Sequence, residues 1–158
     1  NPLRVLEIGT YTGYSALCIA EGLEEGAEVH TIEIDDELEE IIRRNFGRST
    51  FGERITLHLG DAAELLPRFA DEFFDLAFLD GDKRHYWEMY ETTLAKLKRG
   101  GFLLADNTLW HGKVVEKEAA AERQTQGIME FNERLVNDHR VEKVILPLRD
   151  GLTLIRKK

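Results

Sequence analysis

Short apolar runs alternate with amphipathic segments along the chain, and this alternation constrains the fold more than any other feature. Strands are predicted at residues 3–8, 28–34, 55–59, 74–79 and 102–105, with a closing pair at 141–146 and 152–155. Helices are predicted between them at residues 14–22, 36–46, 62–66, 83–98 and 118–137. Nearly continuous apolar strands separated by helices predict an α/β fold, a Rossmann-like doubly wound sheet that is mostly parallel. The closing pair is joined by the turn at 147–151 and predicts an antiparallel hairpin.

The length of 158 residues fits one domain, and the net charge of −9 disfavours a broad nucleic-acid-binding surface. The only cysteine, Cys18, lies in an apolar run, so we expect it to pack as a small core residue. This cysteine usage fits a cytoplasmic location, and no signal peptide or apolar stretch of roughly 18 to 20 residues is visible. The strand pattern begins directly after Asn1-Pro2. We therefore expect residues 1–158 to be a single domain from which an N-terminal segment is missing.

A glycine-containing loop follows the first predicted strand. Gly9 and Gly13 allow a tight turn that approaches a ligand closely, and the next helix directs its N-terminus to the same place. The G-x-x-x-G spacing differs from the dinucleotide G-x-G-x-x-G motif, and no G-K-[ST] follows. The spacing therefore argues against a nicotinamide dehydrogenase, although a plain strand–helix turn would also account for these glycines.

Acidic residues follow the second and third strands. Glu33 is placed to accept hydrogen bonds from ribose hydroxyls, with a solvated loop acid as the alternative. Asp35 and Asp36 are better explained as caps of the next helix. Asp61 either contacts an adenine edge or caps the short helix after it. The loop and these acids predict an adenosine-binding cleft without a phosphate-binding signature, which favours S-adenosylmethionine over NAD or ATP.

Oxygen-bearing side chains follow the fourth and fifth strands. Asp80 ends one strand, and Asp106 and Asn107 end the other. Adjacent parallel strands end at one edge, so these three residues are expected to converge on a divalent cation, Mg²⁺ first, with Mn²⁺ or Ca²⁺ as alternatives. Acids that only cap loops at the sheet edge are the competing interpretation.

Lys83 follows Asp80 by three residues and is the candidate general base. A nearby divalent cation would favour the neutral amine by charge repulsion and would acidify a bound hydroxyl. A surface lysine paired with Asp82 is the alternative. Trp110 and His111 follow the metal-ligand candidates and are expected to line the substrate pocket, although a plain loop histidine is equally consistent.

Five stretches together carry a family resemblance: VLEIGTYTGYSAL, TIEID, GDA, FLDGDKRHY and LLADNTLWHGKVV. They span Val5 to Val115, and the closing hairpin also fits. With these motifs the chain resembles the cation-dependent O-methyltransferases, which include catechol and caffeoyl-CoA O-methyltransferases and bacterial relatives. Gly81 stands where animal catechol enzymes carry His, as in the plant and bacterial branch. His111 departs from the Asn that is usual in plant-type members.

The resemblance implies a seven-stranded sheet whose last strand is antiparallel, and N-terminal helices that help to cover the cofactor. It assigns metal ligation to Asp80, Asp106 and Asn107, assigns the general base to Lys83 and implies a homodimer. It implies cofactor binding by Glu7, Gly9, Tyr11, Gly13, Ser15, Glu33, Asp61, Ala62 and Asp80.

The predicted reaction is transfer of the sulfonium methyl group to one hydroxyl of a vicinal diphenol, a small hydroxylated aromatic substrate. A second hypothesis is methylation of a hydroxylated tRNA base, 5-hydroxyuridine, which the net charge of −9 disfavours. A third, from another class, is a non-catalytic S-adenosylmethionine-binding module. No membrane association is predicted.

Overall fold

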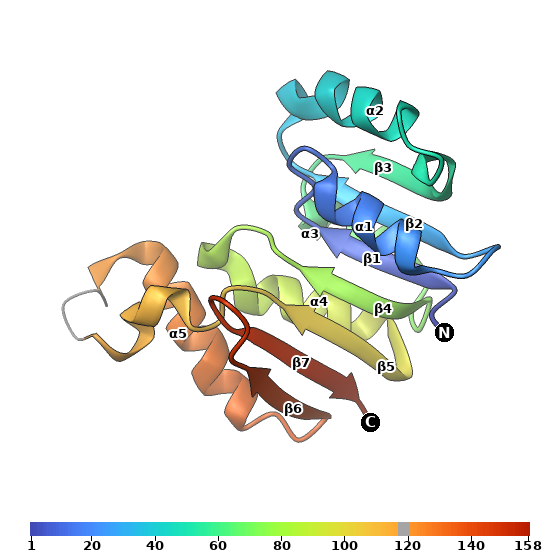
Figure 1. Cartoon of the computed structure of the whole chain (residues 1–158). Helices are drawn as coiled ribbons and strands as arrows, with labels where there is room; N and C mark the ends of the chain where they lie inside the picture. Colours follow the sequence, from blue (N-terminus) through green and yellow to red (C-terminus); the bar gives the residue numbers. More distant parts are fainter. Residues whose placement is uncertain (117–120) are drawn as a thin grey trace.

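A computed structural model describes residues 1–116 and 121–158. It contains a seven-stranded sheet in the order β3-β2-β1-β4-β5-β7-β6 (Figure 1). The strands are β1 (Arg4–Ile8), β2 (Glu28–Glu33), β3 (Ile55–Leu59), β4 (Phe74–Leu79), β5 (Leu97–Ala105), β6 (Val141–Leu146) and β7 (Leu152–Lys157). The helices are α1 (Tyr14–Gly22), α2 (Glu39–Gly47), α3 (Ala62–Leu65), α4 (Tyr86–Lys96) and α5 (Arg123–Val136).

Strands β1 to β5 pair in parallel, whereas β7 is antiparallel to both β5 and β6. This topology confirms the predicted mixed sheet and its antiparallel last strand. Because β7 inserts between β5 and β6, the β6–β7 turn comes to lie beside the carboxyl end of β5, where Thr108 N–H donates to the Gly151 carbonyl oxygen. The last hairpin therefore contributes to the same sheet edge as the loops after β1 to β5.

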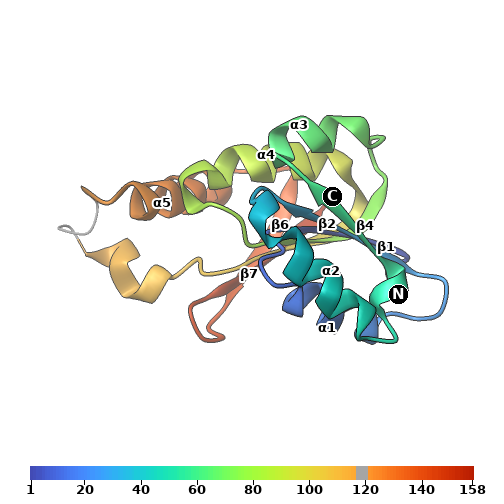
Figure 2. The ribbon, with the colours of Figure 1, turned by 90° about the horizontal axis from the view of Figure 1, so that it is seen from above.

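Helices cover both faces of the sheet (Figure 2), with α1 and α2 on one face and α3, α4 and α5 on the other. On the α1–α2 face, Ala16 packs in a cluster with Ile42 and Phe46 of α2. The larger cluster on the other face joins β-strand residues to Tyr90 of α4 and Phe131 of α5, both fully buried. Burial of both faces explains why apolar residues predominate in the parallel strands.

Several predicted boundaries were wrong. The helix predicted at residues 83–98 is a 3₁₀ turn at Lys83–His85 followed by α4, which ends at Lys96. Strand β5 begins at Leu97, five residues before the predicted start, and contains Gly100 and Gly101. Leu97 pairs with Phe74, and a register irregularity follows before Leu76 pairs with Phe102, so sheet pairing overrides the helical pattern here.

The predicted helix at residues 118–137 begins instead at Arg123, and residues 118–120 of that prediction lie outside the described residues. Cys18 was also predicted wrongly, because it is exposed. Ala16 and Ala20 are the buried positions of α1, and a residue halfway between them on a helix faces away from the sheet. Within the described residues, no helix is long and apolar enough to cross a membrane.

Candidate active site

A cleft of about 550 Å³ lies at the carboxyl edge of the parallel strands. Loops after β1, β2, β3 and β4 form it, and the N-terminal half of α4 closes one side. Of the predicted cofactor residues, those that line the cleft are Gly9, Tyr11, Glu33, Asp61, Ala62 and Asp80. Glu7, Gly13 and Ser15 stand behind this lining, so their predicted contacts are not part of the cleft wall. Open doubly wound sheets bind ligands at this edge.

The loop after β1 depends on its two glycines. Gly9 has φ +100°, and a Cβ atom there would lie 2.5 Å from the carbonyl oxygen of Asp80. Gly13 has φ +84°, and a Cβ atom there would meet the ring of Phe46 at 2.5 Å. Both positions therefore exclude a side chain on steric and conformational grounds. The result is a β1 loop that passes directly against the end of β4.

Glu33 holds this loop from the end of β2. One carboxylate oxygen accepts from the backbone N–H groups of Thr10 and Tyr11 at 3.1 and 2.7 Å, and the other accepts from Asp35 N–H at 2.9 Å. Glu33 is 7% exposed. A buried carboxylate that accepts several N–H bonds is strongly held, so this residue fixes the shape of the cleft.

Helix caps account for the neighbouring acids. The Asp35 side chain accepts from Glu37 N–H at 3.0 Å, as the capping interpretation predicted. Asp61 caps α3 by accepting from Ala63 N–H at 2.8 Å, and it also lines the cleft. The two interpretations of Asp61 are therefore compatible, because its second oxygen is not used by the cap.

Glu7 lies behind the cleft, fully buried on β1. One oxygen accepts from the Thr31 hydroxyl, and the other has no hydrogen-bond partner among the described residues. Burial raises its pKa to about 7, and the hydrogen bond from the Thr31 hydroxyl offsets part of that rise. Glu7 is therefore a carboxyl group whose charge is only partly compensated.

Lys83 is buried beside the cleft. Its Nζ donates to Asp80 Oδ1 at 2.8 Å and to the Tyr86 hydroxyl at 3.3 Å. The alternative pairing of Lys83 with Asp82 does not occur, because Asp82 accepts from Arg84 instead. Tyr86 is fully buried. Its hydroxyl lies within 2.8 Å of the carbonyl oxygens of Leu79 and Asp106, so it connects the ends of β4 and β5 to Lys83.

Asp106 follows β5 and interacts electrostatically with Asp80. Burial raises the pKa of Asp106, the nearby Asp80 charge raises it further, and the Asn107 N–H and Lys83 oppose these effects. Asn107 has φ +60°, which is unusual for a residue other than glycine. Two carboxylates and an amide are a donor set that suits a hard divalent cation. Among the described residues, no three His, Cys, Asp or Glu side chains form a metal-binding group, so the predicted site depends on the Asn107 amide.

Trp110 and His111, the predicted acceptor-site residues, do not line the 550 Å³ cleft. Trp110 packs against the main core and donates through Nε1 to Thr125 Oγ1 at 3.1 Å. His111 lines a neighbouring pocket of about 410 Å³ together with Leu109, Val114 and Asp150. An acceptor would therefore meet these residues beyond the cofactor cleft, beside Asp106 and Asn107.

The sequence analysis missed the contribution of α4 and of one glycine in α5. His85, Met89 and Thr92 line the cleft, and their spacing of four and three residues would have placed them on one helical face. Gly81 has to be small because a Cβ atom there would lie 2.9 Å from the sulfur of Met89. At Gly127, a Cβ atom would lie 2.1 Å from the carbonyl oxygen of Lys83, so α5 packs directly on the lysine turn.

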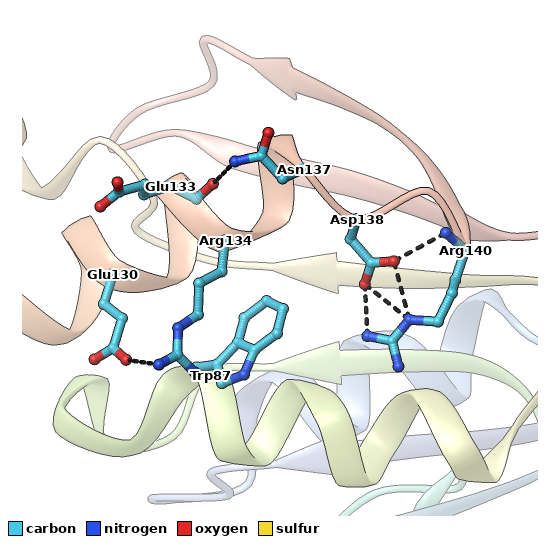
Figure 3. Close-up of a pocket in the computed structure, with 7 residues that line it drawn as sticks. All are labelled: Trp87, Glu130, Glu133, Arg134, Asn137, Asp138 and Arg140. Atoms are coloured by element: carbon cyan, nitrogen blue, oxygen red, sulfur yellow. Dashed lines mark hydrogen bonds and ion pairs between the residues drawn. The ribbon is translucent and has the colours of Figure 1, made fainter.

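A second surface pocket, of about 750 Å³, lies between α4 and α5 and carries charged side chains around Trp87 (Figure 3). Arg134 pairs with Glu130 at 2.7 Å and stacks over the Trp87 ring, and Arg140 pairs with Asp138 at 2.6 Å. These charges pair with one another locally, and none of the predicted site residues lines this pocket.

Sheet order, the nucleoside-sized cleft and the acidic residue at the end of β2 define an α/β methyltransferase architecture. The O-methyltransferase family profile matches residues 1–158. The caffeoyl-CoA O-methyltransferase of Petroselinum crispum is 32% identical over 99% of this chain and 69% of its own length. The catechol O-methyltransferase domain-containing protein 1 of Mus musculus is 35% identical over 98% of this chain and 60% of its own length.

Among solved structures, an S-adenosylhomocysteine-bound methyltransferase from Podospora anserina superposes with a TM-score of 0.88 at 32% identity. The match covers 99% of this chain and 72% of that one. The chain therefore belongs to the O-methyltransferase family, the class of S-adenosylmethionine-dependent enzymes that its fold and its cleft indicate.

Proposed function

We propose that this protein transfers a methyl group from S-adenosylmethionine to one hydroxyl of a vicinal diphenol, with the help of a divalent cation. The observation that carries the proposal is the buried Lys83 amine, 2.8 Å from Asp80 Oδ1 and beside Asp106 at the edge of the cleft. The caffeoyl-CoA and catechol names of the relatives support an acceptor with adjacent oxygens on an aromatic ring.

The cofactor would occupy the 550 Å³ cleft. Glu33 would accept from the ribose hydroxyls with the lone pairs that its backbone donors leave free, and Asp61 would face the adenine edge. The β1 loop, with Gly9, Tyr11, Gly13 and Ser15, would hold the methionine part next to Glu7 and Asp80. The Ala62 turn would close the adenine side.

Asp80, Asp106 and Asn107 would hold the cation, with Mg²⁺ as the first choice for an all-oxygen donor set. When bound there, such a cation stabilises an oxyanion, and the cofactor supplies a methyl group on a sulfonium. Lys83 accepts the proton of the acceptor hydroxyl as the new carbon–oxygen bond forms and the carbon–sulfur bond breaks. Tyr86 keeps the Lys83 amine in place, and Trp110 and His111 orient the aromatic ring.

We include in the proposal a homodimer and a cytoplasmic location, as the resemblance and the cysteine usage suggest. Gel filtration with light scattering tests the first, and a monomer at micromolar concentration would contradict it.

Replacing Lys83 with Met tests the reaction. Turnover of catechol with Mg²⁺ should fall by about 10²- to 10⁴-fold, the usual contribution of a general base. Affinity for S-adenosylhomocysteine, measured by calorimetry, should stay within about twofold because the amine does not line the cofactor cleft. Lys96→Met is the matched control, since Lys96 is also buried and ion-paired but lies far along α4 and contacts Asp71.

Two results would overturn the assignment. Normal turnover by the Lys83→Met variant excludes this lysine as the base. Wild-type activity that survives chelation, or equal rates with catechol and with phenol, excludes cation-assisted recognition of adjacent oxygens.

A further inference from the structure

The turn that carries Trp110 and His111 has a strained backbone. Asn107, Trp110 and His111 have φ angles of +60°, +47° and +54°, in the left-handed region. Each such residue other than glycine costs on the order of 1 kcal/mol, so the turn persists only where its surroundings hold it. Strain of this kind concentrates at binding and catalytic sites.

The β6–β7 turn holds this strained segment through its backbone. Leu109 N–H donates to the Asp150 carbonyl oxygen at 2.9 Å, and Thr108 N–H donates to that of Gly151 at 3.0 Å. The two backbones are in direct contact, because a Cβ atom on Gly151 would lie 2.8 Å from the Leu109 nitrogen. The turn before β7 and the turn after β5 therefore behave as one packed unit.

The Asp150 carboxylate adds a side-chain link to the same segment. Asp150 is 8% exposed, and its Oδ1 accepts from the His111 backbone N–H. Its Oδ2 is buried, has no hydrogen-bond partner among the described residues and lies 3.6 Å from His111 Nε2. A buried carboxylate oxygen without a partner is costly, which points to a role other than stability.

We propose that Asp150 is the positioning residue of the acceptor site. Through Oδ1 it holds the strained backbone at His111, and through Oδ2 it faces the imidazole, which limits where that ring can lie. By holding this turn it also sets Trp110 and Asn107, which lie in the same segment. The inference rests on the proposed function, because it assigns these residues to the acceptor.

The experiment compares Asp150→Ala and Asp150→Asn with Asp138→Ala. Asp138 is a matched control, because it is 9% exposed and accepts from the Tyr90 hydroxyl and from Arg140, in the pocket of Figure 3. The first readout needs no substrate: acrylamide quenching of Trp110 fluorescence in a Trp87→Phe background, where Trp110 is the only tryptophan. The second readout is the KM for catechol with Mg²⁺, alongside calorimetry with S-adenosylhomocysteine.

Asp150→Ala should raise the quenching constant of Trp110 by about twofold and the KM for catechol by about tenfold, while cofactor affinity changes little. Asp150→Asn keeps an oxygen for the His111 N–H, so its quenching should return to the wild-type value. Asp138→Ala should lower Tm without changing quenching or KM. The inference is overturned if Asp150→Ala leaves quenching and KM unchanged, or changes them no more than Asp138→Ala does. If the wild-type protein does not methylate catechol, the proposed function fails, and the quenching comparison still decides whether Asp150 holds the turn.

Discussion

The carboxyl edge of the sheet has two parts that differ in how their negative charge is held. The proposed cofactor half lies around Glu33 and the β1 loop, and the proposed acceptor half lies around Asp80 and Asp106. On the cofactor half, Glu33 is surrounded by backbone donors and accepts from Thr10, Tyr11 and Asp35. On the acceptor half, Asp80 and Asp106 bring like charges together, and burial with this repulsion raises the pKa of Asp106. One half satisfies its negative charge within the chain, and the other leaves part of it uncompensated.

The two halves would therefore respond differently to a bound ligand. The cofactor half has its shape before any ligand arrives, because hydrogen bonds within the chain hold the β1 loop. The acceptor half carries stored repulsion that a bound cation would relieve. Three substitutions test this comparison, in order of decreasing expected effect.

The largest effect is expected at Glu7, which lies between the halves. Burial raises its pKa to about 7 from an ordinary value of 4.5, so the folded state takes up a proton more readily than the unfolded chain. The contribution of the Glu7 carboxyl to the free energy of unfolding is therefore complete below pH 4.5. It falls by roughly 3 kcal/mol as the pH rises to about 7. Urea unfolding at pH 5 and pH 8 tests this. The free energy of unfolding of the wild type should fall between the two pH values, and that of Glu7→Gln should not show this fall. An equal difference between variant and wild type at the two pH values would contradict the prediction.

The next largest effect is expected at Glu33. Glu33→Gln replaces one accepting oxygen with an amide nitrogen, which leaves backbone N–H groups of the β1 loop or of Asp35 without a partner. Affinity for S-adenosylhomocysteine should fall about tenfold or more, the usual consequence of losing a charged acceptor. Calorimetry measures this loss, and Glu28→Gln on the same strand is the control, because Glu28 does not line the cleft and contacts Arg4 and His30 at 3.3 and 3.6 Å. Unchanged affinity in Glu33→Gln would show that the loop holds its shape without this carboxylate.

The smallest effect is expected at Asp106. Asp106→Asn removes one of two repelling charges, so the metal-free variant should melt about 2–4 °C higher than the wild type. Added Mg²⁺ should then raise the Tm of the wild type but not that of the variant. Thermal melts with and without Mg²⁺ make the comparison. A variant that gains as much from Mg²⁺ as the wild type would remove Asp106 from the proposed ligands.

Most strand positions follow from sequence because apolar runs and their spacing record burial directly, whereas the complete strand order comes from the structure. The start of β5 could not be predicted this way, since residues 97 and 98 continue the helical pattern locally and become part of a strand only by pairing with β4. The exposure of Cys18 could not be predicted either, because the apolar residues beside it in the sequence do not determine which side of α1 faces the sheet.

Within the site, motif residues such as Gly9, Glu33 and Asp80 could be placed at the cleft because they follow strand ends. The link from Lys83 through Tyr86 to both strand ends could not, because it depends on a hydroxyl that looks like an ordinary core position in the sequence. Asp150 was missed for a related reason. Its partner turn lies some forty residues away and meets it only because β7 inserts beside β5.

The contact between Gly127 and the Lys83 carbonyl oxygen has a consequence for tracing descent within the family. A relative of this chain can lose methyl transfer while it still carries the lysine that corresponds to Lys83. Any side chain at position 127 would clash with the Lys83 carbonyl oxygen and push α5 away from the lysine turn, even if every polar residue of the cleft were kept in the sequence. We therefore expect inactive relatives among chains that keep these polar residues but carry a bulky residue at position 127.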